Sequence, residues 1–203
     1  QWTEEKLNRI KKYLSAYMTI FKSNPRASKL NTIYVDAFAG TGYRNPEKTD
    51  KDSLPLFIID DNDAINLQKG SAQIALESTP PFNEYIFVEQ SPEYAGELEK
   101  LRLKFNQYYD KITIVQEDAN SYLQSWCKNK DWRFNRAVVF LDPYGMAVDW
   151  KTIEIMAQTR AIDLWLLFPL GQAVNRLLTK NAPPEGAWAE RLTKFFGTDD
   201  WKN

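Results

Sequence analysis

Two short segments of the sequence hold the side chains best suited to bind or react with a ligand. Residues 36–42 read Asp-Ala-Phe-Ala-Gly-Thr-Gly, and residues 142–145 read Asp-Pro-Tyr-Gly. Each segment follows an apolar run, 32–35 or 137–141, that is typical of a buried strand. In doubly wound α/β proteins, ligands bind at the carboxyl ends of the strands. We therefore expect both segments to face a ligand.

The first segment indicates which cofactor the protein binds. Gly40 and Gly42 allow a close approach of the backbone, which a Cβ would block. The dinucleotide fingerprint is incomplete because Asn45 stands in place of its third glycine, and no P-loop ending is present. Asp36 precedes the glycines, where it repels a phosphate and attracts a cation. S-adenosyl-L-methionine carries an ammonium and a sulfonium and no phosphate, so we predict this cofactor over a nicotinamide dinucleotide. An ordinary strand and glycine turn is the alternative.

The second segment suits methylation of an exocyclic amine. That reaction requires a weak nucleophile to be held in line with a sulfonium methyl group, about 3–3.5 Å away. The carboxylate of Asp142 can accept one N–H of the amine, and the backbone carbonyl next to Pro143 can accept the other. Tyr144 can stack on a flat substrate. We predict these three residues to be catalytic, and a strand-ending turn without a catalytic role is the alternative.

The composition excludes several classes of chemistry. None of the 203 residues is a histidine, which excludes Ser-His-Asp and Cys-His catalysis and the usual zinc sites. Cys127 is the single cysteine, so an internal disulfide is excluded, and we interpret it as core filler in a reducing, cytoplasmic compartment. No apolar run approaches the ~20 residues of a membrane span. The net charge of −1 gives no overall attraction to nucleic acid.

Two charged clusters each have two interpretations. The basic residues within 100–104 form either a local patch for nucleic acid or the solvated face of a helix. The aspartates within 60–63 form either a metal site or a solvated helix cap. We favour the cap and predict no metal.

The pattern of apolar residues predicts the elements that position both segments. Five strands alternate with helices, which predicts an α/β fold with a doubly wound, mostly parallel Rossmann-like sheet in a single domain, residues 1–203. The predicted strands are 32–35, 85–88, 112–115, 137–141 and 162–168. Helices are predicted at 3–22, where we expect packing on the sheet edge, at 64–77, and at 173–180 and 187–196 within a helical C-terminal part, 171–203.

The long connection after the first strand is predicted to be an insertion on the substrate side, residues 44–82. It contains a polar loop, 44–53, and a possible short strand, 56–59. Glu89 ends the second strand, where an acidic residue hydrogen-bonds ribose hydroxyls in this fold. The chain opens at Gln1 without a methionine, so we expect the natural N-terminus to lie further upstream.

Both segments resemble motifs of the class I methyltransferases. Asp-x-Phe-x-Gly-x-Gly resembles motif I, and Asp-Pro-Tyr-Gly resembles motif IV of amino-methyltransferases without its second proline, a form similar to that of enzymes that methylate the guanine amino group in transfer RNA. The resemblance implies that Asp118 accepts a hydrogen bond from the adenine amino group; capping of the following helix is the other interpretation, and both can hold. A complete class I methyltransferase usually adds a sixth strand and an antiparallel seventh strand. Neither is predicted before Asn203, so we expect this chain to be cut short. The predicted cofactor-binding residues are Asp36, Ala37, Phe38, Ala39, Gly40, Gly42, Glu89, Gln90, Asp118 and Ala119.

A closer resemblance extends over nearly the whole chain. The chain resembles the three-Cys-motif partner (TcmP) family, which is bacterial and phage-associated, in the segments 2–7, 36–42, 87–90, 140–146, 165–169 and 191–199. The resemblance implies the methyltransferase-like fold, the cofactor, and a radical-SAM-like partner protein with three cysteines. It leaves the reaction open.

Two functions follow as hypotheses. The first is an S-adenosyl-L-methionine-dependent methyltransferase acting on an amino nitrogen, with a nucleobase of DNA or RNA as its bearer. The alternative is a non-catalytic cofactor-binding subunit that serves as the recognition partner of the three-cysteine protein.

Overall fold

One five-stranded sheet organises the described part of the chain, in the order β3-β2-β1-β4-β5 with every neighbouring pair parallel. The computed structural model describes residues 2–39, 70–143, 145–169, 174, 178 and 184–202, with only the backbone of residues 2–4 and 6. The strand order confirms the predicted doubly wound, Rossmann-like α/β fold. The strands are β1 (Asn31–Asp36), β2 (Glu84–Val88), β3 (Ile112–Val115), β4 (Asn135–Leu141) and β5 (Ile162–Leu166).

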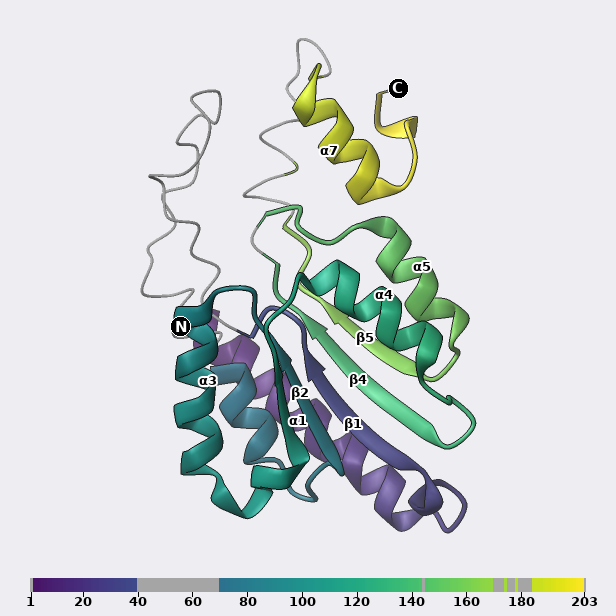
Figure 1. The fold of residues 1–203 in the computed structure, drawn as a ribbon. Coiled ribbons are helices and arrows are strands. Elements are labelled where there is room, and N and C mark those ends of the chain that lie inside the picture. Colours follow the sequence, from purple (N-terminus) through teal and green to yellow (C-terminus); the bar gives the residue numbers. More distant parts are fainter. Residues whose placement is uncertain are drawn as a thin grey trace.

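Helices cover both faces of this sheet (Figure 1). One face is covered by α1 (Trp2–Ser23), the helical residues 70–76 and α3 (Pro92–Lys104). The other face is covered by α4 (Ala119–Asn129) and α5 (Trp150–Gln158). Beyond the carboxyl ends of the strands stands α7 (Ala187–Phe196), which contacts α5. Short 3-10 helices are η1 (Ala27–Lys29), η3 (Asn106–Lys111) and η5 (Asp200–Lys202).

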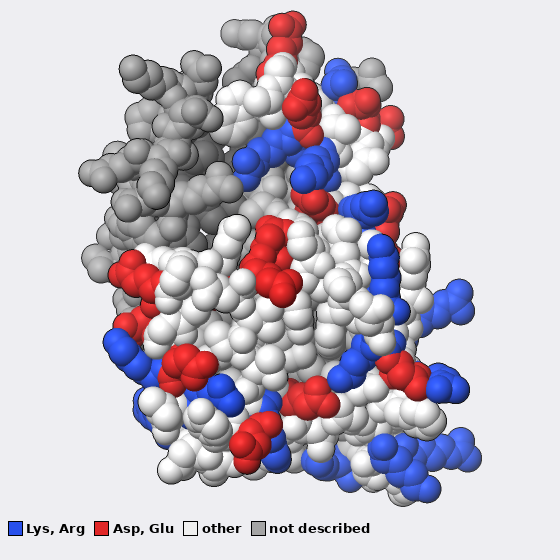
Figure 2. Space-filling view, viewed as in Figure 1, with Lys and Arg blue, Asp and Glu red and all other residues white. Residues whose placement is uncertain are grey.

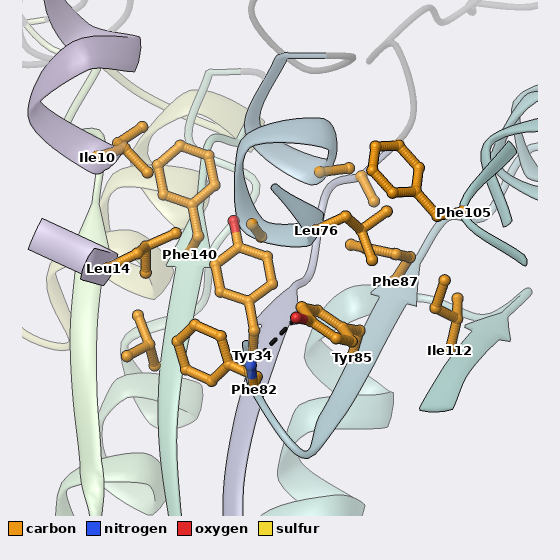
Figure 3. Close-up of a cluster of buried hydrophobic side chains, with 14 of the residues drawn as sticks. Ile10, Leu14, Tyr34, Leu76, Phe82, Tyr85, Phe87, Phe105, Ile112 and Phe140 are labelled. Atoms are coloured by element: carbon orange, nitrogen blue, oxygen red, sulfur yellow. Dashed lines mark hydrogen bonds between the residues drawn. The ribbon is translucent and has the colours of Figure 1, made fainter. Parts of the chain in front are cut away.

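Successive strand residues bury their side chains on opposite faces. In β1, Tyr34 lies in the cluster under α1, whereas Ile33 and Val35 lie in the cluster under α4 and α5, and all three are 0% exposed. Parallel strands buried on both faces read as continuous apolar runs, which is why the sequence pattern located them. Figure 3 shows the aromatic side of this core, where the backbone N–H of Phe82 donates to the hydroxyl of Tyr85 at 3.1 Å.

The N-terminal helix lies across a face of the sheet, so the prediction that it packs on the sheet edge is wrong. Leu14 and Met18 are 1% and 0% exposed, and they share one buried cluster with Tyr34 and Phe140 of the central strands. Figure 3 shows Leu14 near these rings. The helical spacing of its apolar residues presents a stripe wide enough to cover the sheet.

The crossover from β1 to β2 ends in a helix that belongs to the core. Ala72, Ala75, Leu76 and Phe82 are buried, so residues 70–82 of the segment assigned to the insertion cover the sheet. Several predicted features lie outside the described residues. They are the loop 44–53, the strand 56–59, the aspartates within 60–63, and the helix 173–180 apart from Val174 and Leu178.

The single cysteine of the chain lies in the core. Cys127 is 4% exposed in the cluster between α4 and the sheet, and burial raises the pKa of its thiol to about 12. Its interpretation as core filler is confirmed.

Within the described ranges, no helix combines the length and the apolar character that crossing a membrane requires.

Candidate functional site

Three acidic residues stand at the same edge of the sheet. Asp36 is the last residue of β1, Glu89 follows β2, and Asp142 follows β4. The strand order reverses at β1, with β2 on one side and β4 on the other, which makes this the topological switch point where open α/β sheets bind ligands. Figure 2 shows acidic side chains gathered just beyond the strand ends, with basic side chains above them at the level of α7. This edge of the sheet is the candidate site.

Asp36 is the buried acid of the site, with 1% of its surface exposed. Its Oδ2 accepts a hydrogen bond from the hydroxyl of Ser71 at 2.7 Å, and its carboxyl also accepts one from the backbone of Phe38. The pKa of Asp36 is raised to about 7, mainly by burial and also by the negative charges of Asp142 and Glu89, while the two hydrogen bonds act to lower it. Asp142 and Glu89 are therefore each close enough to Asp36 for their charges to disfavour its ionised form.

The backbone after Asp36 is fixed between the two neighbouring strands. The N–H of Ala37 donates to the carbonyl of Phe140 at 3.1 Å, and the N–H of Ala39 donates to the carbonyl of Val88 at 3.1 Å. Both alanines are buried, and Phe38 is partly buried against the α4 and α5 cluster. The predicted loop residues Ala37, Phe38 and Ala39 thus lie at the switch point, while Gly40 and Gly42 lie outside the described residues.

Glu89 extends from the end of β2. Its side chain is half-buried, and its Oε1 accepts a hydrogen bond from the backbone N–H of Ser91 at 2.7 Å. Ser91 occupies the N-cap position of α3, where its hydroxyl makes no cap hydrogen bond and its backbone N–H is bound by Glu89. Gln90 is exposed beside it. A carboxylate anchored in this way can still accept from the hydroxyls of a ribose.

Asp118 caps α4. Its Oδ1 accepts a hydrogen bond from the backbone N–H of Ser121 at 2.9 Å, which is the capping geometry for a helix N-terminus. The capping interpretation is confirmed, and the hydrogen bond to an adenine amino group stays a prediction. The side chain of Asp118 is exposed, and Ala119 is buried as the first residue of the helix.

The segment after β4 continues the edge of the site. Asp142 is half-buried, Pro143 is buried, and Tyr144 lies outside the described residues. Gly145 has a φ of +59°, which only glycine adopts without strain. Phe140 pairs with Asp36 in the sheet register, so Asp142 lies two residues beyond the partner of Asp36, and its charge raises the pKa of Asp36. The predicted catalytic acid and the predicted cofactor-binding acid are therefore brought together.

Asn120 is a site-positioning residue that the sequence analysis missed. Its Nδ2 donates to the carbonyl of Ala147 at 2.8 Å, and its Oδ1 accepts from the N–H of Asp149 at 2.9 Å and from the hydroxyl of Thr152 at 2.8 Å. These bonds join the first turn of α4 to the segment that follows Gly145. An asparagine beside a cap carries no local signal for such a role, because its partners are distant in sequence.

A second missed feature is an exposed aromatic ring at the end of β5. Phe168 is 47% exposed and packs on Phe195 and Phe196 of α7, with ring centroids 5.2 and 6.4 Å away. The N–H of Leu167 donates to the carbonyl of Leu141 at 2.9 Å, so the pairing of β4 with β5 continues past the strand ends. Phe168 therefore stands one residue past this bond, on the segment that neighbours Asp142 and Pro143.

The basic cluster at 100–104 does not reach this site. Lys100 pairs with Glu97 at 2.7 Å, and the guanidinium of Arg102 lies 3.9 Å from the ring centre of Tyr109. These residues end α3, which begins at the carboxyl edge and runs back to the opposite edge of the sheet. The solvated-face interpretation fits these contacts. Within the described ranges, no three acidic, cysteine or histidine side chains are grouped as ligands for a metal.

Comparisons with known proteins add weak likenesses only. No family model and no curated protein matches the chain. A conserved hypothetical protein of Streptococcus pyogenes is similar over 71% of this chain and 68% of its own, with 18% identity and a TM-score of 0.39. A Legionella pneumophila (strain Philadelphia 1) protein of the family DUF519 is similar over 76% of this chain and 60% of its own, with 15% identity and a TM-score of 0.40. The resemblance to the three-Cys-motif partner family stays a prediction.

Proposed function

We propose that the protein is an S-adenosyl-L-methionine-dependent methyltransferase that acts on an amino nitrogen of a nucleobase in DNA or RNA. The observation that carries the proposal is the convergence of Asp36, Glu89 and Asp142 on the switch point of the sheet. Ionising the buried Asp36 beside the negative charges of Asp142 and Glu89 costs free energy, and a nearby cation or hydrogen-bond donor lowers that cost. A ligand with positive charge and many hydroxyl and amino donors relieves this cost.

The donors and acceptors of the site fit this cofactor. Asp36 supplies negative charge beneath the loop of residues 37–39, Glu89 offers acceptors for ribose hydroxyls, and Asp118 offers a second carboxylate oxygen for the adenine amino group. The backbone of residues 37–39, bonded to β4 and β2 on either side, would face the ligand. The bound cofactor supplies an electrophilic methyl group on its sulfonium.

The residues after β4 would hold the acceptor amine. Asp142 accepts one N–H of the amine and the carbonyl beside Pro143 accepts the other, which turns the nitrogen lone pair out of conjugation with the ring. Tyr144 offers a stacking surface for a flat base. This arrangement works by orientation and needs no histidine as a general base.

The first experiment is calorimetric titration of the protein with S-adenosyl-L-methionine and then with S-adenosyl-L-homocysteine. We expect both to bind with micromolar dissociation constants. Transfer of tritiated methyl groups to DNA, to RNA and to free nucleosides then identifies the acceptor. NADH serves as the control ligand, because its pyrophosphate is disfavoured by Asp36.

Two results would overturn the proposal. Absence of binding to either cofactor form, alone or with the three-cysteine partner, removes the methyltransferase function. Cofactor binding without methyl transfer to any nucleic acid, together with co-purification of the partner, favours the recognition-subunit function that the sequence analysis left open.

A further inference from the structure

Ser71 makes a buried contact with the acid at the centre of the site. The Oγ of Ser71 donates a hydrogen bond to Oδ2 of Asp36 at 2.7 Å, across 35 residues of sequence. Ser71 is 0% exposed and Asp36 is 1% exposed, so the bond is shielded from water. Hydrogen bonds to an ionised group in such surroundings are stronger than those between neutral groups.

Close packing fixes the position of Ser71. It belongs to the helical residues 70–76, where Ala72 and Ala75 are both 0% exposed under the sheet. At Gly70, a Cβ would lie 2.9 Å from the side chain of Leu7 in α1, so this helix approaches α1 as closely as a glycine allows. The backbone that carries Ser71 is therefore held within the closely packed layer that covers this face of the sheet.

Among the described residues, the charged groups that affect the pKa of Asp36 are acidic. Asp142 faces it from the end of β4 and Glu89 from the end of β2, and the phenol of Tyr34 lies on its own strand. Among the described residues, the hydroxyl of Ser71 and the backbone of Phe38 donate to its carboxyl, and Ser71 lowers the pKa more than Phe38 does. The hydrogen bond from Ser71 thus lowers the pKa of Asp36, whereas burial and the charges of the two neighbouring acids raise it.

We propose that Ser71 is a positioning residue of the cofactor site, which holds the carboxyl of Asp36 in place for the cationic part of the ligand. The inference rests on the proposed function and assigns a role in it to the helix that follows the β1 connection. Ser71 touches neither reacting atoms nor, in this assignment, the ligand. It acts through the orientation and ionisation of Asp36.

The first test needs no ligand. Carbon-13 NMR of aspartate-labelled protein follows the carboxyl titration of Asp36, assigned by its loss in Asp36→Asn. We expect Ser71→Ala to move the titration midpoint of Asp36 to higher pH by about one pH unit, since a lost hydrogen bond to the ionised form is worth about that much. Ser71→Thr keeps the hydroxyl and should restore the midpoint. Unchanged midpoints in Ser71→Ala overturn the inference whatever the ligand is.

The second test measures the affinity for S-adenosyl-L-methionine between pH 6 and pH 8.5. We expect Ser71→Ala to weaken binding by about tenfold at pH 7 and by less at pH 8.5, where Asp36 ionises even without the bond. Ser78→Ala is the matched control, because Ser78 is also buried but donates to the carbonyl of Ala75 at 2.8 Å, away from Asp36.

The two failures are distinguishable. If the wild-type protein binds no cofactor, the proposed function fails, and the carboxyl titration still decides whether Ser71 controls Asp36. If the wild type binds and Ser71→Ala binds equally well at every pH, the positioning role fails while the proposed function stands.

Discussion

The side-chain Oδ1 of Asn120 accepts a hydrogen bond from the backbone N–H of Asp149 at 2.9 Å, across 29 residues of sequence. Asn120 follows β3, and Asp149 closes the segment that begins with the predicted catalytic acid after β4. The same amide donates to the carbonyl of Ala147, so both of its polar atoms are used. The shape of the segment after β4 therefore depends on a residue from the other half of the candidate site.

Removing that amide should destabilise the protein and disturb the site. We expect Asn120→Ala to lower the free energy of unfolding by about 1–3 kcal/mol, because it leaves part-buried donors and acceptors without partners. Denaturant unfolding measures the change. Asn129→Ala in the same helix is the control, since its exposed side chain makes a single bond to Ser125 at 3.2 Å. Equal stability of both variants would show that the Asn120 bonds are not needed to hold the segment.

Asp142→Ala should separate catalysis from cofactor binding. The variant loses the acceptor for the target amine, so we expect methyl transfer to fall below detection while affinity for S-adenosyl-L-methionine stays within about threefold. Single-turnover transfer and calorimetry measure the two quantities. Asp110→Ala is the control, because Asp110 lies in η3 just before β3, at the opposite edge of the sheet. Full activity of Asp142→Ala would remove its catalytic role.

Glu89→Ala should weaken cofactor binding. The carboxylate is the acceptor assigned to the ribose hydroxyls, and hydrogen bonds to charged groups contribute about 1.5–3 kcal/mol, so we expect a loss of at least about tenfold in affinity. Glu89→Gln keeps an acceptor for the Ser91 N–H and separates the ligand effect from the turn. Glu93→Ala, an exposed acid in the first turn of α3, is the control. Unchanged affinity in both Glu89 variants would assign the ribose to another group.

Two substitutions separate the two roles of Asp118. Asp118→Ser retains an N-cap oxygen on a shorter side chain, whereas Asp118→Ala removes the cap and should cost about 1 kcal/mol of stability. If Asp118 also accepts from adenine, both variants lose cofactor affinity although only the alanine variant loses stability. Wild-type affinity in Asp118→Ser would leave Asp118 with the capping role alone.

Asp36→Asn tests the burial of this acid through the pH dependence of stability. The pKa of Asp36 in the folded state, about 7, lies above its ordinary value of 3.8, so the folded protein binds more protons between these values and loses stability as the pH rises from about 4 to 7. Asparagine has no proton to lose. The unfolding free energy of Asp36→Asn minus that of the wild type should therefore increase by at least about 1 kcal/mol between pH 5 and pH 8.

The control for this measurement is Asp110→Asn, which removes an exposed aspartate at the opposite edge of the sheet. A difference between Asp36→Asn and the wild type that stays constant from pH 5 to pH 8 would mean that the carboxyl of Asp36 is ionised throughout this range.

Much of the fold could be predicted because its signals are local. The apolar runs at 137–141 and 85–88 lie in β4 and β2, and the acids Glu89 and Asp142 follow these strands directly. Parallel strands bring their carboxyl ends to one edge, so acids spaced far apart in sequence were expected together. The cap of α4 at Asp118 was also readable, since an N-cap bonds to a backbone only three residues away.

The same local reasoning failed at Asp149. An aspartate directly before an apolar helical run is a typical N-cap, and Asp149 does stand at the N-cap position of α5, but its side chain makes no cap hydrogen bond. Its Oδ2 instead forms an ion pair with Lys194 of α7 at 3.0 Å. The choice between these partners depends on where α7 docks, which no pattern within α5 contains.

The sequence alone determined which residues form strands, which face the interior, and which acids end the strands, because hydrophobic periodicity and the strand-end position act over a few neighbouring residues. The tertiary structure alone decided that α1 lies across the sheet, that Ser71 holds Asp36, and that Asn120 holds the segment after β4. Each of these contacts joins residues that are ordinary in their own segments. They form because packing brings distant backbone segments to hydrogen-bonding distance, and the buried polar groups then take the partners that this packing provides.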